Sequence, residues 1–294
     1  MLLILLAVGS VLWVTLTSAT RNTFELLGER ASTTLDVLEA RVDGQLSSVA
    51  LGMQDFAAQF ADGRLNIANK RAQTLNTFSG FLSSHPQVLA LIYIEKDKTS
   101  LTVKRQEGYV VEVNDTRTTE DRRDFALNLA FDKRRPFWGD PLWVPAANGA
   151  VLTHLAPVWR CDDFLGVVLA PVSLSRISAF LKTLEGEDDL SAFILHNRDR
   201  VLAHPRLDEA TLPTTTSPTE NALPTLDNVP EPAFRLLKGQ GDEALLLLEF
   251  AADVTNARAD DDTIIITRET TKFGPALWTL GLKLERAIVG QEAD

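Results

Sequence analysis

The chain has 294 residues, which suits one large or two ordinary domains, and its 45% hydrophobic content supports a packed core and excludes wholesale disorder. A formal net charge of −11 disfavours nucleic-acid binding, because that function needs a basic surface. The single cysteine, Cys161, excludes both an intrachain disulfide and a cysteine-based metal site.

Residues 1–20 carry no charged side chain and have the length that crosses a bilayer core as a helix. We therefore predict a transmembrane helix over 1–20. A cleaved signal peptide is the alternative, although the basic residues that normally open such a peptide are absent. Because a membrane anchor would also carry a basic cytoplasmic flank, we expect the numbering to start inside a longer protein.

Residues 21–62 show the period of one long amphipathic helix. From Phe24 to Phe60, apolar residues recur every three or four positions over about ten turns without a proline. Gly44 and Gly52 should weaken this helix slightly. A helix of this length directly after a membrane span is a stalk, whose apolar stripe should pack along the following domains and against a second copy in a homodimer. A plain coiled coil is the alternative, but it leaves the strands that follow unexplained.

Residues 63–185 read as a module that contains both helices and strands. An amphipathic segment at 65–82 ends before Pro86, because the residue that precedes a proline leaves the helical conformation. The two longest apolar runs are separated by a polar tetrad at 160–163, which predicts a hairpin, and Ser173 or Ser175 can cap the helix that follows. The expected strands are 88–95, 100–104, 109–113, 151–159 and 164–172, and a short helix is expected at 121–131.

Residues 186–286 read as a second module, which follows an acidic break at 184–189. A proline-rich polar loop at 205–232 interrupts this module, and a short helix is expected at 229–237. The strand spacing suits a five-stranded antiparallel sheet, and 287–294 looks like the start of an outgoing helix. The expected strands are 192–196, 200–203, 244–250, 263–267 and 277–284.

The segments 138–181 and 192–206 resemble double Cache (dCache) sensor domains, which are the extracytoplasmic ligand-binding parts of bacterial transmembrane receptors. The resemblance covers roughly residues 22–290. It implies an α+β fold, in which a long N-terminal stalk helix is followed by a membrane-distal and a membrane-proximal PAS-like module, each with an antiparallel sheet. The matching residues of the first segment are Trp138, Trp143, Pro157, Val158, Asp162, Asp163, Phe164, Leu165, Gly166, Val167, Val168, Val172, Ser173, Leu174, Phe180 and Leu181.

The resemblance also implies a function and a location. The chain would be the small-ligand sensor region of a receptor in the bacterial inner membrane, with residues from about 21 onward in the periplasm. The variant is most similar to sensors of bacterial adenylate cyclases, so the expected output is an adenylate cyclase that follows this segment. A histidine kinase, a diguanylate cyclase or a chemoreceptor output is the alternative, because the same sensor fold is joined to all of them.

The ligand site is expected in the distal module, around its tryptophans. Trp138 and Trp143 supply apolar faces, Arg135 a cation whose planar fork suits a carboxylate, and His154 a titratable ring. Tyr93, in the middle of a predicted strand, is a further lining residue with a phenolic donor. The alternative is that both tryptophans are core residues and Arg135 is a solvated charge. The motif of the amino-acid-binding dCache subset is not clearly present, so amino acids are not carried over as the ligand.

No catalytic motif stands out in the sequence. There is no Gly-x-Ser-x-Gly elbow, no phosphate-binding glycine loop and no His-Glu-x-x-His pair. His196 and His204 are expected on the surface of a hairpin, where His204 would hydrogen-bond loop backbone. We therefore expect no metal and no cofactor. A membrane-anchored extracytoplasmic enzyme, such as a hydrolase, is the alternative of a different class, but it would need a nucleophile with a nearby base.

Overall fold

The computed structural model describes residues 2–106, 109–113, 120–144, 149–184, 190–207, 223–240, 242–243, 256–259, 263–273 and 276–285. Before Glu29 it describes the backbone of the first helix, but among the side chains only that of Trp13. The predicted strand at 244–250 and the predicted outgoing helix at 287–294 lie outside the described residues.

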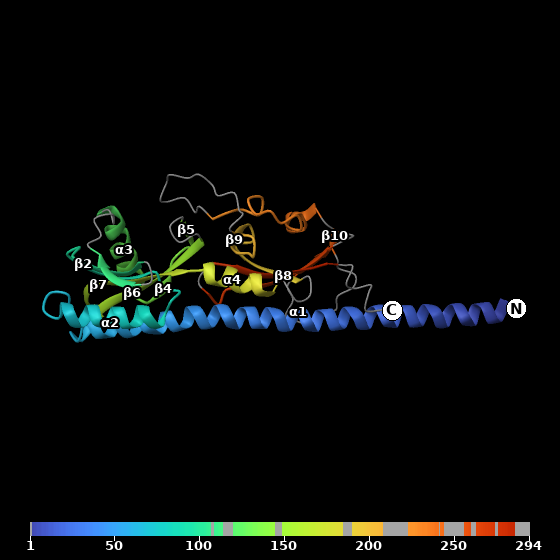
Figure 1. Ribbon diagram of the computed structural model, residues 1–294, viewed down its shortest axis with the longest axis horizontal. Helices are drawn as coiled ribbons and strands as arrows, with labels where there is room; N and C mark the ends of the chain where they lie inside the picture. The colour runs from blue at the N-terminus through green and yellow to red at the C-terminus, as the bar shows by residue number, and fades with distance from the viewer. Residues whose placement is uncertain are drawn as a thin grey trace.

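Helix α1 (Leu2–Ala61) is a single 60-residue helix along which both sheets are arranged (Figure 1). Its predicted apolar stripe is confirmed from Ala31 onward, where the stripe residues are almost completely buried. From Ala31 onward the stripe packs against the strands of both sheets, so one continuous core joins the two sheets along this part of α1. Its buried residues are Ala31, Leu35, Leu38, Val42, Leu46, Val49, Met53, Phe56, Ala57 and Phe60.

Over the part of the chain that the structure describes, no helix is long and apolar enough to cross a membrane. The transmembrane helix at 1–20 therefore stays a prediction.

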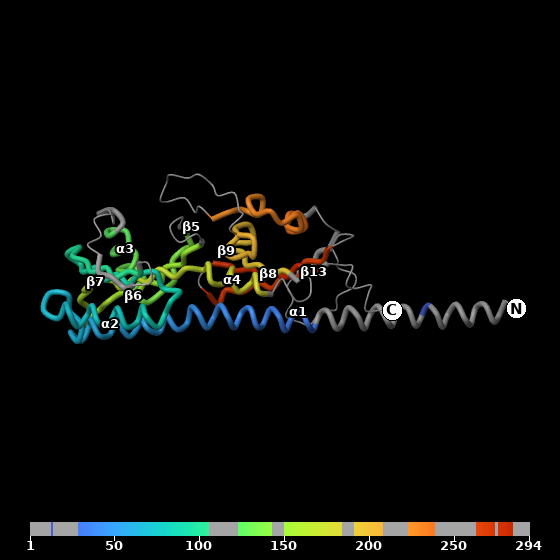
Figure 2. Tube along the Cα trace, viewed as in Figure 1, coloured from blue at the N-terminus to red at the C-terminus, as the bar shows by residue number. Residues whose placement is uncertain are grey.

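Helix α2 (Arg71–Ser84) lies beside the C-terminal part of α1 (Figure 2). Its aromatic rings pack edge-on against Phe56 of α1, with centroids 5.1 Å away for Phe78 and 5.2 Å for Phe81. The prediction that this helix begins at residue 65 is wrong. The carboxamide oxygen of Asn66 accepts hydrogen bonds from the N–H groups of Ala68 and Asn69, at 2.9 Å and 2.8 Å, and so closes a turn before the helix begins.

The α1–α2 contact predicts opposite effects for two glycine-to-alanine changes. A Cβ at Gly52 would collide with the ring of Phe81, whereas a Cβ at Gly44 would meet nothing within 4 Å. Gly52→Ala should therefore lower the unfolding free energy by about 1–3 kcal/mol, and Gly44→Ala should raise it by about 0.5–1 kcal/mol, because alanine is the better helix former. Urea unfolding of the two variants checks this, and an equal change in both would contradict the packing assigned to Gly52.

Sheet A contains seven antiparallel strands in the order β3-β2-β1-β7-β6-β4, with β5 also paired to β6. Helix α3 (Glu120–Lys133) packs against this sheet, whereas α4 (Ser175–Leu184), which follows β7, contacts strands of the second sheet. The long central hairpin is the predicted one, and its turn is formed by Cys161 and Asp162. The strands are β1 (Ala90–Glu95), β2 (Ser100–Gln106), β3 (Tyr109–Val113), β4 (Phe137–Trp138), β5 (Leu142–Val144), β6 (Gly149–Arg160) and β7 (Asp163–Ser173).

The two faces of sheet A are covered by different helices. One face contributes to the α1 core through alternate residues of β6 such as Leu152 and Ala156. The other face packs against α3, where Leu155 contacts a smaller cluster with Ala126 and Ala130. Figure 1 shows α3 on the side of the sheet away from α1. We call these the α1 face and the outer face.

Within the described residues, sheet B contains six antiparallel strands in the order β10-β11-β12-β13-β8-β9. Its α1 face joins the long core through residues such as Leu280 and Leu282. Its outer face carries a second cluster, which the segment 223–240 covers with the π-helix η3 (Leu236–Gln240). The strands are β8 (Leu190–His196), β9 (Arg200–Ala203), β10 (Asp242–Glu243), β11 (Asn256–Ala259), β12 (Thr263–Thr270) and β13 (Trp278–Glu285).

Polar contacts tie α1 to both sheets. At its C-terminus, the Nε of Arg160 donates to the carbonyl oxygen of Ala61 at 2.7 Å, which places a cation where the helix dipole is negative. In sheet B, the guanidinium of Arg268 pairs with Asp36 and donates to the hydroxyl of Ser32 at 3.1 Å. Lys272 adds longer ion pairs to α1, at 3.7 Å to Glu39 and 3.6 Å to Asp43.

The expected fold class is confirmed, since a long N-terminal helix is followed by two modules with antiparallel sheets. The described strands of sheet A lie within 90–173 and those of sheet B within 190–285. The residue boundaries of the modules stay predictions, because 185–189 lies outside the described part of the chain.

Candidate functional site

The structure brings two of the predicted site residues together. Trp138 of β4 lies opposite His154 of β6, and their ring centroids are 4.7 Å apart at an interplanar angle of 74°. Trp138 packs against the α1 core, and His154 shares its face of the sheet with Leu152 and Ala156. The pair therefore lies on the α1 face of sheet A, where it touches the core that contains the long helix.

Burial determines the charge of His154. The side chain is 2% exposed, its Nδ1 has no hydrogen-bond partner, and burial lowers the pKa of His154 to about 4. The imidazole is therefore neutral at pH 7. A neutral ring beside Trp138 offers an edge-to-face contact and one ring nitrogen for a hydrogen bond, but no charge.

The lowered pKa of His154 predicts acid sensitivity. In the unfolded chain histidine titrates near 6.5, so below that pH the unfolded state binds a proton that the folded state does not bind. Stability should fall as the pH decreases from 7 to 5, with His154 accounting for about 2 kcal/mol of the loss. His154→Phe keeps a ring against Trp138 and should flatten this part of the pH profile, measured by urea unfolding. The same pH slope in both proteins would contradict the prediction.

Tyr93 lies apart from that pair. It is on β1, with β7 between its strand and β6, and its ring stacks on Phe60 of α1 with centroids 3.7 Å apart. The residue is 3% exposed, and burial, with the charge of Glu95 as a smaller cause, raises the pKa of Tyr93. Tyr93 is thus a contact between sheet A and α1, on the same face as Trp138 and His154 but not beside them.

The remaining two predicted residues are not brought to this pair. Arg135 is exposed in the turn between α3 and β4. Trp143 lies on β5 opposite Ala150, and its side chain is outside the described part of the structure. The set of Tyr93, Arg135, Trp138, Trp143 and His154 therefore remains a prediction as a ligand site.

The neighbouring arginine, Arg134, makes an aromatic contact that the sequence analysis did not predict. The guanidinium carbon of Arg134 lies 4.6 Å from the ring centroid of Trp159, near the tip of the β6–β7 hairpin. Phe131 and Phe164 complete the cluster, with centroids 5.4 Å and 5.0 Å from that of Trp159. The indole N–H of Trp159 is buried without a hydrogen-bond partner. The sequence signal was the pair of arginines before Trp138, but both are exposed and the sequence did not tell which of them lies over an aromatic ring.

A cavity of ≈ 200 Å³ lies on the outer face of sheet B. Glu269 of β12 accepts from the guanidinium of Arg198, which comes from the β8–β9 turn, through both carboxylate oxygens, and this pairing lowers the pKa of Glu269. Sequence analysis missed this site because its residues are dispersed between 195 and 279. The lining residues are Leu195, Arg198, Leu237, Ile265, Thr267, Glu269 and Thr279.

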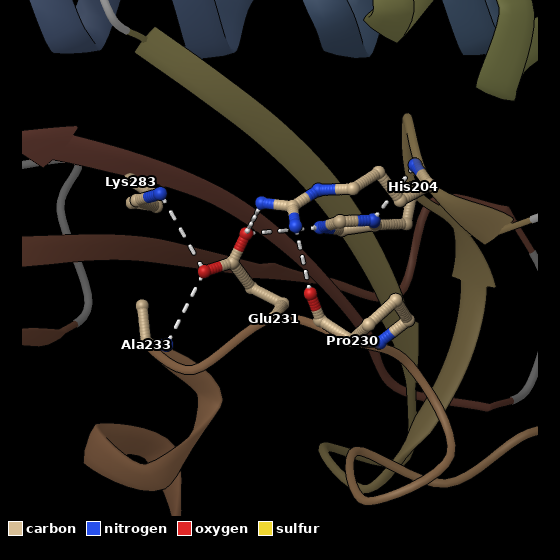
Figure 3. Close-up of polar contacts among 6 residues, drawn as sticks. His204, Pro230, Glu231, Ala233 and Lys283 are labelled. Atoms are coloured by element: carbon tan, nitrogen blue, oxygen red, sulfur yellow. Dashed lines mark hydrogen bonds and ion pairs between the residues drawn. The ribbon is translucent and has the colours of Figure 1, made fainter. Parts of the chain in front are cut away.

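A buried carboxylate anchors the segment that covers this face (Figure 3). Glu231 has a side chain only 2% exposed, and its Oε1 lies 3.5 Å from the Nζ of Lys283 and accepts from the N–H of Ala233 at 3.2 Å. Its Oε2 accepts from Arg206 at 3.2 Å and lies 3.7 Å from the Nε2 of His204. These contacts hold the 223–240 segment against β13 and the end of β9.

The surface positions expected for His196 and His204 are wrong, since they are 3% and 1% exposed. The backbone contact of His204 is confirmed, because its Nδ1 accepts from the N–H of Arg206 at 3.1 Å. Burial, assisted by the charges of Arg206 and Lys283, lowers the pKa of His204 to about 3. Among the described residues, no group of three or more His, Cys, Asp and Glu side chains is arranged to hold a metal ion.

No family model matches the chain, and a search of curated proteins finds no match either. Solved structures do match it over almost their whole length. The ligand-binding domain of the Pseudomonas aeruginosa amino-acid chemoreceptor PctC, in complex with GABA, has 18% identity and a TM-score of 0.58. That match covers 89% of this chain and 100% of the PctC domain.

Two further structures show the same arrangement. The ligand-binding domain of the Pseudomonas fluorescens chemoreceptor CtaA, in complex with L-isoleucine, has 15% identity and a TM-score of 0.55, over 94% of this chain and 98% of that one. The extracellular domain of a protein described as the histidine kinase vpHK1S-Z8 has 12% identity and a TM-score of 0.62, over 92% and 99%. All three are ligand-binding or extracellular domains rather than catalytic domains. The chain therefore has the fold of Cache-type receptor sensor domains.

Proposed function

We propose that this chain is the extracytoplasmic sensor region of a membrane receptor and that it binds a small molecule. The observation that carries the proposal is the single core in which α1 packs against both sheets of a Cache-type fold. A helix that packs against both modules can change its position when the packing of either module changes. The hydroxyl of Ser84 lies 3.0 Å from the Nδ1 of His85, but the two residues are chain neighbours at the end of α2 and both atoms also contact the carbonyl oxygen of Phe81. This local pair caps the helix end and does not favour the enzyme alternative.

The contacts of α1 suggest how a bound ligand would act. Tyr93 stacks on the helix, and the Trp138–His154 pair lies on the same face of sheet A. A ligand that repacks this face changes the surface against which α1 rests. Because Arg160 holds the C-terminal carbonyl of α1 and Arg268 holds its middle, a shift at the distal end would move the helix relative to sheet B.

The ligand site proposed for the distal module consists of Tyr93, Arg135, Trp138, Trp143 and His154. The structures of PctC with GABA and CtaA with L-isoleucine support small organic molecules as the ligand class, and amino acids are the first of these to test. No cofactor and no metal are proposed.

The remaining parts of the proposal concern the rest of the receptor. Residues 1–20 would form a transmembrane helix in a bacterial inner membrane, residues from about 21 onward would lie in the periplasm, and 287–294 would begin an outgoing helix. The stalk would form a homodimer. The output proposed is an adenylate cyclase, on the sequence resemblance alone, and a chemoreceptor or kinase output fits the solved structures equally well.

A thermal-shift screen of the 294-residue protein against amino acids, organic acids, amines, nucleosides and sugars tests the proposal. A ligand at 100 times its dissociation constant should add about 2.7 kcal/mol to the free energy of unfolding. Arg135→Ala should abolish the shift given by a hit, whereas Arg64→Ala, another exposed arginine, should leave it intact. A screen without a hit would argue against a small-molecule sensor. A hit that survives both Arg135→Ala and Trp138→Ala would place the ligand elsewhere.

A further inference from the structure

The cavity of sheet B has a floor made by three adjacent strands. In the antiparallel register, Glu269 of β12 lies opposite Thr279 of β13, which in turn lies opposite Leu195 of β8. Thr267 is two residues from Glu269 and therefore on the same face. Leu237 of η3 lines the cavity from the covering segment, and Ile265 adds a second apolar wall.

The floor carries three oxygen acceptors at neighbouring positions, which are the Glu269 carboxylate and the hydroxyls of Thr267 and Thr279. The Thr279 hydroxyl is buried and has no hydrogen-bond partner, and its residue is 4% exposed. A buried hydroxyl without a partner is costly unless something binds it. The pocket thus contains a polar group in need of a hydrogen bond.

Arg198 occupies the outer side of this arrangement. Its side chain is 68% exposed, whereas that of Glu269 is only 19% exposed. The arginine comes from a tight turn in which Asn197 and Arg198 both have positive φ, at 51° and 68°. The carboxylate is therefore fixed in the floor, while the guanidinium reaches it from solvent and can leave it without disturbing the sheet.

The cover over the cavity is held independently of that ion pair. Glu231 anchors the 223–240 segment to the rest of the module through Arg206 and Lys283. Below it, the ring of Phe193 packs edge-on against Phe234, with centroids 5.1 Å apart. Removal of the Arg198 side chain would therefore open the cavity without releasing its cover.

We propose that this cavity is a second ligand site, which takes a small primary ammonium compound. An ammonium group has N–H donors and no acceptor, and the floor presents to it the negative charge of Glu269 and, at the paired position, the Thr279 hydroxyl that has no hydrogen-bond partner. The apolar walls suit a short alkyl chain. The net charge of −11 also favours the approach of cations. Arg198 provides the competing cation, so a ligand displaces its guanidinium from Glu269.

Strand β12 connects this cavity to the long helix α1. Arg268, the residue before Glu269, points to the other face of β12 and pairs with Asp36 of α1. Neighbouring residues of one strand thus contact the amine site and the stalk. This inference concerns sheet B and stands independently of the ligand proposed for the distal module.

Calorimetric titration with n-butylamine at pH 7 tests the proposal, with butyrate at equal ionic strength as the matched control of the same length and opposite charge. The 294-residue protein should bind butylamine and not butyrate. Glu269→Gln should weaken butylamine binding at least about tenfold, because the charge of the acceptor is lost. Thr279→Val, which keeps the shape of the side chain, should weaken it several-fold. Arg198→Ala should strengthen it, because the competitor is gone.

The Arg198→Ala result separates a binding site from a structural ion pair. A merely structural pair predicts no gain in amine affinity, so unchanged or weaker binding in Arg198→Ala would overturn the proposal. Equal binding of butylamine and butyrate would overturn it as well. If Glu269→Gln does not fold, the butylamine affinities of Thr279→Val and Arg198→Ala still test whether this cavity binds the amine. Arg64→Ala, which changes an exposed arginine outside both proposed sites, should leave butylamine binding unchanged. Because Arg135→Ala and Trp138→Ala test the distal module and the variants of Glu269, Thr279 and Arg198 test this cavity, a failure of either proposal gives a different result.

Discussion

Replacing Glu231 with glutamine is expected to lower the free energy of unfolding by about 3 kcal/mol. The carboxylate is 2% exposed and faces two cations, Lys283 at 3.5 Å and Arg206 at 3.2 Å. His204, with a pKa lowered to about 3, is neutral at pH 7 and contributes no charge. Glutamine keeps the shape and one oxygen acceptor, but it leaves the ammonium of Lys283, whose side chain is 17% exposed, without a counter-ion.

A surface ion pair provides the matched control for this charge removal. Lys96 and Asp163 lie 2.9 Å apart, with side chains 57% and 60% exposed. Asp163→Asn should therefore cost less than about 1 kcal/mol. Urea unfolding of both variants makes the comparison. Similar small losses would show that the Glu231 contacts do not anchor the covering segment, and the covered outer face of sheet B would then need another explanation.

The long helix was predictable because it is buried on one side only. Each turn places one or two apolar residues toward the sheets, and the opposite side is exposed, so the period of 3.6 is visible in the sequence. The effect of the glycines of this helix on its packing was harder to predict from the sequence. Gly52 permits the close approach of Phe81, a residue 29 positions later, and nothing in the local sequence indicates that contact.

The long strands were also found, as was the four-residue β9, whereas β4, β5 and β11 were not. Strands β6 and β7 are rich in β-branched and apolar residues, because both of their faces are covered. In contrast, β4 has two residues and β5 has three, inside a stretch that reads as a loop. Strand β11, Asn-Ala-Arg-Ala, has little β-propensity and pairs with β10 and β12. Its pairing partners, rather than its composition, make it a strand.

The candidate sites show what a single sequence cannot determine. Where both faces of a sheet are covered, alternation between apolar and polar residues is weak, so the sequence did not indicate that Tyr93 and His154 face α1. The choice between Arg134 and Arg135 depends on how the chain leaves α3, where Arg134 adopts a φ of 56°. The cavity of sheet B depends on register across three strands, and register is a property of pairing.

Gly166→Ala should lower the free energy of unfolding by about 3 kcal/mol or more, because two costs add. Gly166 has a φ of 154°, which L side chains rarely adopt, and a Cβ there would collide with the carbonyl oxygen of Ile94. The collision involves backbone on the adjacent strand β1, which cannot rotate away as a side chain can. Gly166 pairs with both Glu95 and Val158, so the strain would fall on the three central strands of sheet A.

The control for this variant is Gly80→Ala in α2, where a Cβ would meet nothing within 4 Å and where alanine should raise the free energy of unfolding by about 0.5–1 kcal/mol.

Hydrogen exchange can locate the strands that Gly166→Ala destabilises. Strands β1 and β7 are of particular interest, because they also carry the face on which α1 rests. Amides of β1 and β7 should lose protection while those of β12 and β13 keep it, because the strain falls on sheet A. Equal loss in both sheets would contradict this prediction and would mean that α1 joins them into one cooperative unfolding unit.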